Sequence, residues 1–399
     1  MNSKKYVLVA NMGSSSIKLN LFEFDNNLFV SKAKVQADRV MQLNSNLKIS
    51  FFNDQLFKFE KENLGIEEVL KITIEKLDEK FDFKSNPILY CAHRYVHGGK
   101  IFKMPLIVDK ASIIELEKIN NLAPLHNPSN LNGIIVMMNL LPKITQIAVF
   151  DTAIFRRVEE DSIYSLPIEI SKRLGIEKYG FHGSSHKYVF EESTKFMDIP
   201  KEKLSGITCH LGSGCSITGW KNGTPIKNSM EYSPTSGLMM STRTGDIDPI
   251  AVLDLAEEYG IEKTRHILTK ESGLQGISGV KGGDLRDIIN NMENGDTNST
   301  LAFNMYILRI KEKIGEFIPV IGGLDFIAFT AGVGENSSLV REKVCEGFKW
   351  LGADINKNLN KTKKSGIISM EDSKIKILVI PTDEELMIAK ESYNLLFSN

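Results

Sequence analysis

Residues 7–22 read VLVANMGSSSIKLNLF: an apolar run, a turn of small residues, and a second run that alternates apolar and polar residues. This pattern predicts two strands joined by a hairpin turn. Residues 206–220, GITCHLGSGCSITGW, repeat the same layout, with Gly212 lying 199 residues after Gly13. We therefore predict an α/β chain built from a duplicated core, although glycine and serine turns after strands are common enough for the match to arise by chance.

The composition is that of a globular protein of two or three domains. Of its 399 residues, 42% are hydrophobic and 25% charged, and 49 basic residues nearly balance 50 acidic ones. This charge balance argues against nucleic acid as the main partner. No apolar run reaches 18 residues and the N-terminal one is short, so we expect neither a membrane span nor a signal peptide. The four cysteines form no CxxC pair, which argues against structural zinc and favours a reducing cytoplasm.

Helical periodicity alternates with apolar strands along the chain, which favours an α/β architecture. No linker is marked by composition, and we place the domain boundary near Phe150 and Asp151, where a strand over 144–150 ends. Asp109, Asp248 and Asp383 stand where helix caps are expected. The expected helices are 65–81, 111–122, 131–141, 249–259, 337–348 and a last helix after Asp383.

The first glycine turn carries features of an anion-binding loop. In Asn11-x-Gly13-Ser-Ser-Ser16-x-Lys18, turn amides and hydroxyls can donate to an anion, and the lysine adds positive charge. The pattern differs from the P-loop GxxxxGK[ST], and its bland alternative is a serine-rich turn.

Six of the seven histidines lie in motifs rich in Gly, Ser or Pro, which favours a site over scattered core positions. His93 and His97 flank Arg94, a residue suited to carboxylates and phosphates; a metal site here is a weaker interpretation than core histidines. His182 and His186 have the spacing of zinc ligands, but the segment lacks the glutamate of HExxH.

Three further segments complete the inventory. In the loop 234–249, Asp248 is expected to cap a helix while Arg243 faces a ligand. The turn 332–336 opens a helix after a buried strand, which is a common geometry for nucleotides. Carboxylates near Asp383 could order Mg²⁺ through water. No Ser-His-Asp order or cysteine nucleophile is evident, so phosphoryl transfer fits best.

These motifs closely resemble those of the acetate kinase family, within the superfamily of acetate and sugar kinases, Hsp70 and actin. The match covers essentially the whole chain, and the joint order and spacing of its motifs make it specific. They are NMGSSSIK, HRYVHGG, APLHNP, FDTAIF, YGFHGSSH, HLGSG, TRTGDIDP, FTAGVGENS and PTDEELMIA.

The resemblance implies a two-lobed, duplicated, actin-like (ribonuclease H-like) α/β fold with mixed central sheets and an interlobe cleft. The last helix would return to the first lobe, giving lobes of 1–150 plus 384–399, on the acetate and phosphate side, and 151–383, on the nucleotide side. It implies reversible, direct in-line transfer of the γ-phosphoryl group of ATP to acetate, giving acetyl phosphate and ADP. Mg²⁺ is the implied cofactor, with Mn²⁺ as an alternative, and the implied assembly is a cytoplasmic homodimer.

The resemblance also implies catalytic residues. Arg94 and Arg243 correspond to the arginines that hold the carboxylate and neutralise the transferring group. His182 corresponds to the histidine that contacts this group, and Asp151 to an aspartate of the catalytic centre. The residues implied to position Mg²⁺ and its waters are Asn11 and Glu384.

A small apolar pocket for the acetate methyl group is implied at Val96, Leu125, Phe181 and Pro234. Phosphate-side and nucleotide contacts are implied at a larger set of positions in the glycine turns and beyond. These are Lys18, His126, His210, Leu211, Gly212, Ser213, Gly214, Asp284, Leu285, Arg286, Gly332, Val333, Gly334, Glu335 and Asn336.

Three departures from the family pattern bear on nucleotide affinity rather than on the reaction class. Ser213 replaces the usual asparagine of HLGNG, so a phosphate contact is expected to be lost or taken over by water. Glu231 and Tyr232 follow Met230 where the family often has glycine, and Leu285 stands where an aromatic residue or methionine is common.

Three alternatives remain open at this point. Another short-chain acyl kinase, acting on propionate or butyrate, differs only in pocket size, and one methylene is worth only about 1–3 kcal/mol. An actin- or Hsp70-like ATPase would not need both Arg94 and Arg243. A non-catalytic relative is hinted at by Ser213 alone.

Overall fold

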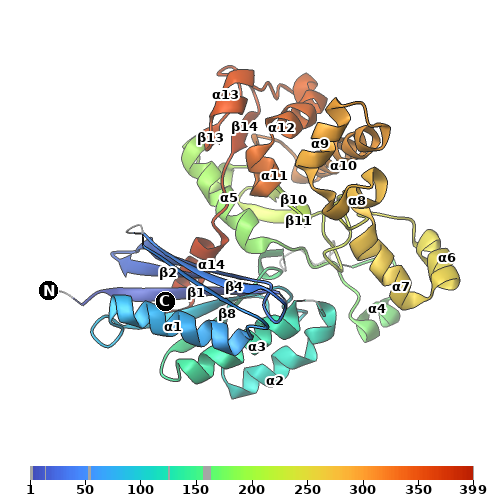
Figure 1. Ribbon diagram of the computed structural model, residues 1–399. Coiled ribbons are helices and arrows are strands. Elements are labelled where there is room, and N and C mark those ends of the chain that lie inside the picture. Colours follow the sequence, from blue (N-terminus) through green and yellow to red (C-terminus); the bar gives the residue numbers. More distant parts are fainter. Residues whose placement is uncertain (1–2, 14, 53–54, 125, 156–162, 399) are drawn as a thin grey trace. The chain divides into compact units, whose positions relative to one another are not determined.

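The computed structural model describes residues 3–13, 15–52, 55–124, 126–155 and 163–398 (Figure 1). The chain divides into two compact units. The first comprises Met1–Ile154 and Asp383–Asn399, and the second comprises Phe155–Thr382. Leu125, expected in the methyl pocket, lies outside the described residues.

The first unit is built on an eight-stranded mixed sheet with the order β5-β4-β3-β2-β1-β6-β8-β7. Strands β1 to β5 form an antiparallel meander, whereas β6 pairs parallel with both β1 and β8. The strands are β1 Lys5–Met12, β2 Ser16–Asp25, β3 Leu28–Asp38, β4 Ser45–Phe51, β5 Leu56–Lys61, β6 Ile88–Tyr95, β7 Leu106–Ile107 and β8 Thr145–Phe150.

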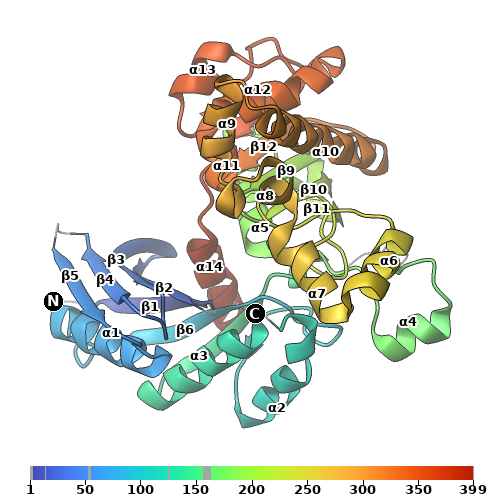
Figure 2. The ribbon, with the colours of Figure 1, turned by 45° about the vertical axis from the view of Figure 1, so that its right-hand side comes forward.

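Helices cover both faces of this sheet around β1, which explains why residues 7–10 are apolar without alternation. Leu8 and Ala10 pack in the core that also holds buried residues of α1 and α3, whereas Val7 and Val9 pack with buried residues of α14. Figure 2 shows α1 and α3 together against the sheet and α14 on its other side. The helices of this unit are α1 Ile66–Phe81, α2 Lys110–Lys118, α3 Asn127–Leu140 and α14 Glu384–Phe397.

The second unit has a six-stranded mixed sheet with the order β11-β10-β9-β12-β14-β13. Its strands are β9 Gly206–Leu211, β10 Cys215–Lys221, β11 Thr224–Asn228, β12 Phe326–Thr330, β13 Gly366–Ile367 and β14 Lys376–Val379. Its helices are α4 Ile168–Leu174, α5 Gly183–Met197, α6 Pro249–Tyr259, α7 Ile261–His266, α8 Gly273–Ser278, α9 Leu285–Glu293, α10 Thr297–Ile321, α11 Ala331–Asn336, α12 Ser338–Cys345 and α13 Lys357–Thr362.

Helices α5 and α10 cover opposite faces of the second sheet. Phe190 of α5 stacks on Trp220 of β10, with ring centroids 4.2 Å apart. The neighbouring Gly219 faces α10, where a β-carbon would lie 3.0 Å from Ile321 Cγ2. Successive residues of a strand point to opposite faces, so these two contacts fix the layers.

The predicted duplication is confirmed. Order and direction are the same in β3-β2-β1-β6-β8 as in β11-β10-β9-β12-β14. The hairpin turns also match, because β1 ends at Met12 and β9 at Leu211, while β2 begins at Ser16 and β10 at Cys215. Both pairs are separated by the 199 residues expected from the sequence.

The three helix caps that the sequence predicts are confirmed. Asp109 accepts from Ser112 N, Asp248 from Ile250 N and Asp383 from Leu386 N. Helix α3 begins at Asn127 rather than 131, because Pro128 has no N–H to lose in a first turn. Strands β3 to β5 and the 25-residue α10 were not expected. No helix in the described ranges is long and apolar enough to cross a membrane.

His93 is a core histidine of the first unit, which is the interpretation that the sequence favoured over a metal site. Its side chain is 1% exposed, and its Nε2 lies 2.8 Å from Gln146 Oε1. Gln146 Nε2 donates to Ile144 O, so the Oε1 accepts from His93 Nε2–H. Burial lowers the pKa of His93 to about 4, and the imidazole is neutral at physiological pH.

This buried histidine should make the first unit less stable in mild acid. The unfolded histidine has a pKa of about 6.5, whereas the folded one has a pKa of about 4. Between these values only the unfolded chain takes up the proton, so the free energy of unfolding falls as the pH falls, by up to roughly 1.4 kcal/mol per unit. Urea unfolding of wild type and His93→Gln from pH 7 to pH 5 measures this. Parallel pH profiles for the two chains would contradict it.

Candidate functional site

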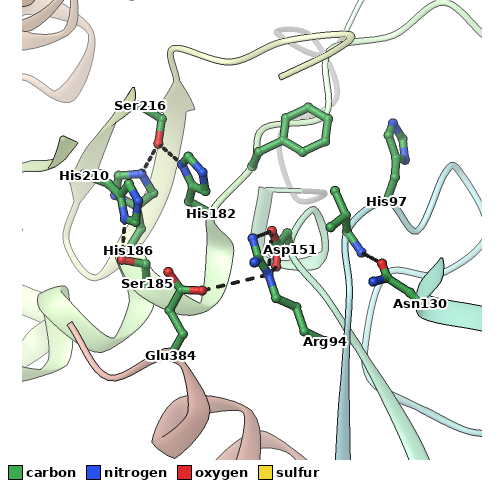
Figure 3. Close-up of polar contacts among 12 residues, drawn as sticks. Arg94, His97, Asn130, Asp151, His182, Ser185, His186, His210, Ser216 and Glu384 are labelled. Carbon is green, nitrogen blue, oxygen red and sulfur yellow. Dashed lines mark hydrogen bonds and ion pairs between the residues drawn. The ribbon is translucent and has the colours of Figure 1, made fainter. Parts of the chain in front are cut away.

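In the first unit, a bidentate ion pair joins the ends of two parallel strands. Arg94, the penultimate residue of β6, donates from Nε to Asp151 Oδ1 at 3.0 Å and from Nη2 to Asp151 Oδ2 at 2.6 Å. Asp151 directly follows β8, and its N–H donates to Tyr95 O at 3.0 Å, which extends the strand pairing by one residue. Figure 3 shows the guanidinium lying against this carboxylate. Sequence reasoning selected both residues but not their contact.

The pair is held away from water. The Asp151 side chain is 2% exposed and that of Arg94 19%, and Glu384 Oε2 at the start of α14 lies 3.9 Å from Arg94 Nε. Burial by itself would lower the pKa of Arg94, but the charges of Asp151 and Glu384 outweigh it and raise the pKa overall. Burial raises the pKa of the Asp151 carboxyl, and Arg94 opposes this shift.

The first glycine turn lies at the end of β1 in the same unit. Gly13 N–H donates to Ser16 O at 2.7 Å, and Asn11 of β1 pairs in register with Lys18 of β2. Asn11 is half-buried and Lys18 is exposed.

The metal-ligand prediction of Asn11 and Glu384 fits a strongly hydrated cation. Both side chains offer oxygen donors, which Mg²⁺ prefers. Across the ranges that the structure describes, no three His, Cys, Asp or Glu side chains cluster as a metal site. An ion that keeps most of its waters suits such a sparse donor set, whereas a closed zinc site would not.

Two buried amides of α3, which sequence reasoning missed, hold the segment that follows Arg94. Asn130 Oδ1 accepts from Val96 N at 3.1 Å, and its Nδ2 donates to Met12 O at the end of β1. Asn127 Oδ1 accepts from His97 N at 3.1 Å. The signal was present in the sequence as two asparagines in a first helical turn, but the backbone groups of Met12, Val96 and His97 that they bind are 30 or more residues away.

In the second unit, nitrogen-bearing side chains surround the glycine turn after β9. A β-carbon on Gly214 would lie 3.5 Å from both His182 Cε1 and Arg243 Nη1, and one on Gly212 would lie 3.8 Å from His210 Nε2. The rings of His182 and His210 stack, with centroids 4.1 Å apart. Nitrogen-bearing side chains gathered at a glycine turn are the arrangement expected around an anion.

Arg243 has no carboxylate within ion-pair distance in the part of the chain that the structure describes. Its Nη1 donates to Pro234 O at 2.9 Å, and burial lowers the pKa of the guanidinium. Ser241 N–H of the same loop donates to Ser213 O, which ties the loop to the glycine turn. A half-buried cation that has no counter-charge among the described residues is suited to an anionic ligand.

Hydroxyl groups fix the orientation of the histidines beside this turn. His182 Nδ1 lies 2.9 Å from Ser216 Oγ, and His210 Nδ1 lies 2.8 Å from Ser185 Oγ. Figure 3 shows Ser216 between His182 and a second ring, that of His186. His182 itself adopts a left-handed backbone conformation, φ +57°, at the residue before α5.

The third glycine turn, at α11, is braced from within. Glu335 Oε1 accepts from Ala331 N at 2.8 Å and from Thr382 N at 3.2 Å, so this carboxylate is directed at its own backbone. Arg341, which is 2% exposed and was not predicted, donates to Gly334 O and Glu335 O, each at 2.8 Å. Asn336 Nδ2 donates to Gly332 O, and Gly332 and Asn336 are exposed. Val333 is half-buried.

The remaining nucleotide candidates lie at the start of α9. Asp284 caps this helix. The Arg286 side chain folds back onto the Asp284 carboxylate, and Arg286 Nη2 donates to Asp284 Oδ2 at 2.6 Å. Hydrogen bonds from Arg286 lower the pKa of Asp284 to about 2. Leu285 is buried at 6% exposure, so its side chain belongs to the packing of α9. Arg286 is the exposed group of this set.

The methyl-pocket candidates are apolar and mostly buried. Val96 of the first unit is 7% exposed, and Phe181 of the second is 1% exposed. Phe181 N–H donates to Asn228 Oδ1, and Asn228 Nδ2 donates back to Phe181 O, both at 3.3 Å. Pro234 is half-buried and supplies the carbonyl that Arg243 contacts.

Comparison with known proteins adds independent findings. A sequence model of the acetokinase family matches residues 6–390. An acetate kinase of Halothermothrix orenii is 39% identical over 399 residues, which cover 98% of this chain and 100% of the relative. The crystal structure of Porphyromonas gingivalis acetate kinase has a TM-score of 0.89 at 36% identity, covering 99% of this chain and 100% of that one. A propionate kinase from Francisella tularensis has a TM-score of 0.90 at 32% identity, covering 97% and 98%.

Two arginine–aspartate pairs of equal length allow burial to be tested as the source of stability. Arg94 and Asp151 meet at 2.6 Å with the carboxylate 2% exposed, and Arg286 and Asp284 meet at 2.6 Å with the arginine 90% exposed. Asp151→Asn should cost roughly 3 kcal/mol or more, because it leaves a charge without its partner in a poorly hydrated place.

A double-mutant cycle of Arg94→Gln with Asp151→Asn should therefore show strong coupling in urea unfolding. The matched cycle of Arg286→Gln with Asp284→Asn should show almost none, since exposed pairs are screened by water. Similar coupling in the two cycles would contradict this assignment.

Proposed function

The chain belongs to the acetokinase family, and we propose that it transfers the γ-phosphoryl group of ATP to acetate, reversibly, forming acetyl phosphate and ADP. Full-length similarity to acetate kinases supports this reaction. The structural observation that carries it is Arg243: a half-buried guanidinium without a described carboxylate partner, beside His182 and the Gly212–Gly214 turn. Such a group suits a transferring phosphoryl oxygen or a carboxylate.

Our proposal assigns the chemistry to five side chains. Arg94 and Arg243 hold the carboxylate and neutralise the phosphoryl oxygens, and His182 donates a hydrogen bond to that group as charge develops on it. Asp151 keeps the Arg94 fork in a single orientation through its two hydrogen bonds. Acetate is ionised at neutral pH and attacks directly, so no general base is needed. Glu384 belongs to the metal side.

Asn11 and Glu384 would hold Mg²⁺ together with its waters, and the bound ion would supply positive charge to balance the phosphate oxygens. Within the first unit, Lys18 adds a positive charge opposite Asn11 on the paired strand. We assign this unit to the acetate and phosphate side.

The second unit is assigned to the nucleotide. Gly212, Ser213 and Gly214 form its phosphate turn with His210, and the exposed Arg286 and the turn 332–336 form its adenosine contacts. Asp284 and Glu335 act indirectly in this assignment, because each carboxylate is bound to its own local backbone.

A second candidate is propionate as the acceptor, and the Francisella tularensis propionate kinase favours it at 32% identity. Val96, Phe181 and Pro234 supply the apolar side chains proposed for the acyl group. One methylene changes discrimination by only about 1–3 kcal/mol, so the preference depends on small differences in pocket volume.

We propose that the chain works as a homodimer in the cytoplasm. Exposed apolar side chains gather on α4, α6 and α7, which Figures 1 and 2 show together at one end of the second unit. The most exposed are Ile168, Leu174, Ile250, Leu253 and Ile261, between 55% and 68%. A second copy of the chain would cover this surface, and the mass in solution tests it against the 44.7 kDa of one chain.

Hydroxamate trapping of acyl phosphate tests the reaction directly. With ATP and Mg²⁺, acetate should give a hydroxamate, with kcat/KM for acetate above that for propionate and butyrate. A higher value for propionate would favour the second candidate. ATP hydrolysis that ignores all three acids would contradict both and favour an ATPase of the actin or Hsp70 type.

Arg243→Ala should lower kcat by about 10²–10³ while the chain stays folded, because the lost interaction is made with developing charge. Its stability should hardly change, since Arg243 has no ion pair among the described residues to lose. Arg309→Ala, at an exposed arginine of α10, is the matched control and should keep full activity. Turnover near wild type in Arg243→Ala would count against the assignment.

A further inference from the structure

Four buried side chains of the second unit, from Trp220 to Ser216, form a hydrogen-bonded series that leads to His182. Ser216 Oγ lies 2.9 Å from His182 Nδ1 and 2.7 Å from His186 Nε2. His186 Nδ1 lies 2.8 Å from Thr208 Oγ1, which accepts from Trp220 Nε1 at 2.9 Å. All four are at most 3% exposed. They come from β9, β10 and α5, so these hydrogen bonds connect the sheet to the helix that covers it.

The direction of every hydrogen bond in this series can be worked out from Trp220, its last member. An indole N–H can only donate, so Thr208 Oγ1 accepts from Trp220. In the described structure, Thr208 Oγ1 has one other partner, His186 Nδ1, and its own proton must go there. A proton left without an acceptor in this buried place would cost about 1–3 kcal/mol.

The same argument continues to the site. Burial lowers the pKa of His186 well below its usual value, so this imidazole is neutral and has a single N–H. Since its Nδ1 accepts from Thr208, the proton is on Nε2 and is donated to Ser216 Oγ. The Ser216 hydroxyl has no other described acceptor than His182 Nδ1, and it donates there.

We propose that Trp220, Thr208, His186 and Ser216 are positioning residues that hold His182 as the Nε2–H tautomer, with its donor directed at the transferring phosphoryl group. The role of His182 in catalysis rests on the proposed function, whereas its tautomer follows from the hydrogen bonds alone. The ring edge bearing Cε1 and Nε2 of His182 borders the Gly212–Gly214 turn, near Arg243 Nη1. These hydrogen bonds thus keep His182 Nε2 protonated as a donor, whereas a general base at this position would need an unprotonated nitrogen.

The neighbouring His210 provides a contrast. Its Nδ1 contacts Ser185 Oγ, which contacts Thr382 Oγ1 at 2.9 Å. Both partners are hydroxyls that can turn either way, so this pair of contacts assigns no tautomer. Of these two sets of described contacts, the one that ends on Trp220 has a defined direction.

Long-range ¹H–¹⁵N spectra of the full chain with ¹⁵N-labelled histidine test the proposal in the absence of substrate. His182 and His186 should both appear as Nε2–H tautomers at neutral pH, with signals assigned by single His→Gln variants. In Trp220→Phe, the Thr208 hydroxyl can turn, so both rings should shift towards a mixture with the Nδ1–H form. The His210 signal should keep its tautomer pattern. Wild-type His182 as the Nδ1–H tautomer or as imidazolium would overturn the proposal.

Matched substitutions at Thr208 separate position from packing. Thr208→Val keeps the shape but removes the hydroxyl, whereas Thr208→Ser keeps the hydroxyl. Thr208→Val and Trp220→Phe should each lower kcat by about 3- to 30-fold, the rate equivalent of one misdirected buried hydrogen bond. KM for ATP should stay within about twofold, because the interaction strengthens in the transition state. Thr208→Ser should restore the tautomer and most of the activity.

The two readouts distinguish the possible failures. If the tautomers respond as expected while wild type forms no acyl phosphate, the hydrogen-bonded series stands and the proposed function fails. If wild type is active but a shifted tautomer leaves kcat unchanged, the positioning role is overturned. Phe190→Leu, which disturbs the ring stacked on Trp220 without touching this series, is the packing control and should keep the tautomers.

Discussion

A guanidinium taken out of water needs a negative partner, and the two candidate arginines meet this requirement in opposite ways. Arg94 is balanced within the protein, because β6 and β8 run parallel and bring Asp151 to its side. Arg243 is held by the carbonyl of Pro234 and has no carboxylate nearby among the described residues. The first arginine is therefore oriented by the fold, whereas the second is suited to a charge that a ligand brings.

The duplicated topology explains why the glycine turns come to equivalent places. In each unit the turn joins the first two strands of the same five-strand arrangement. The side chains around them differ, with Lys18 opposite Asn11 in one and two stacked histidines with Arg243 in the other. One backbone plan thus serves two kinds of polar contact, and side-chain identity decides which.

Local chemistry made parts of the fold predictable. The hairpins at Gly13 and Gly212 follow from strand alternation around small residues, and the caps at Asp109, Asp248 and Asp383 bind amides two or three residues away. The roles of carboxylates were harder to predict from the sequence, because a carboxylate can bind either a ligand or a nearby backbone N–H. Asp284 and Glu335 resemble nucleotide contacts in the sequence, yet both bind their own backbone, because the first N–H groups of a helix have no partner within the helix.

The α/β class, the helix caps at Asp109, Asp248 and Asp383, and the motifs that carry the family resemblance could be read from the sequence, which also suggested the internal duplication. Each of these depends on periodicity or on hydrogen bonds within a few residues. The folded structure was needed to show that Arg94 binds Asp151, 57 residues away, and that Ser216 links two histidines 30 and 34 residues distant. Such partners are chosen by strand pairing and layer packing, which bring distant residues together through the burial of the whole core rather than through any local pattern.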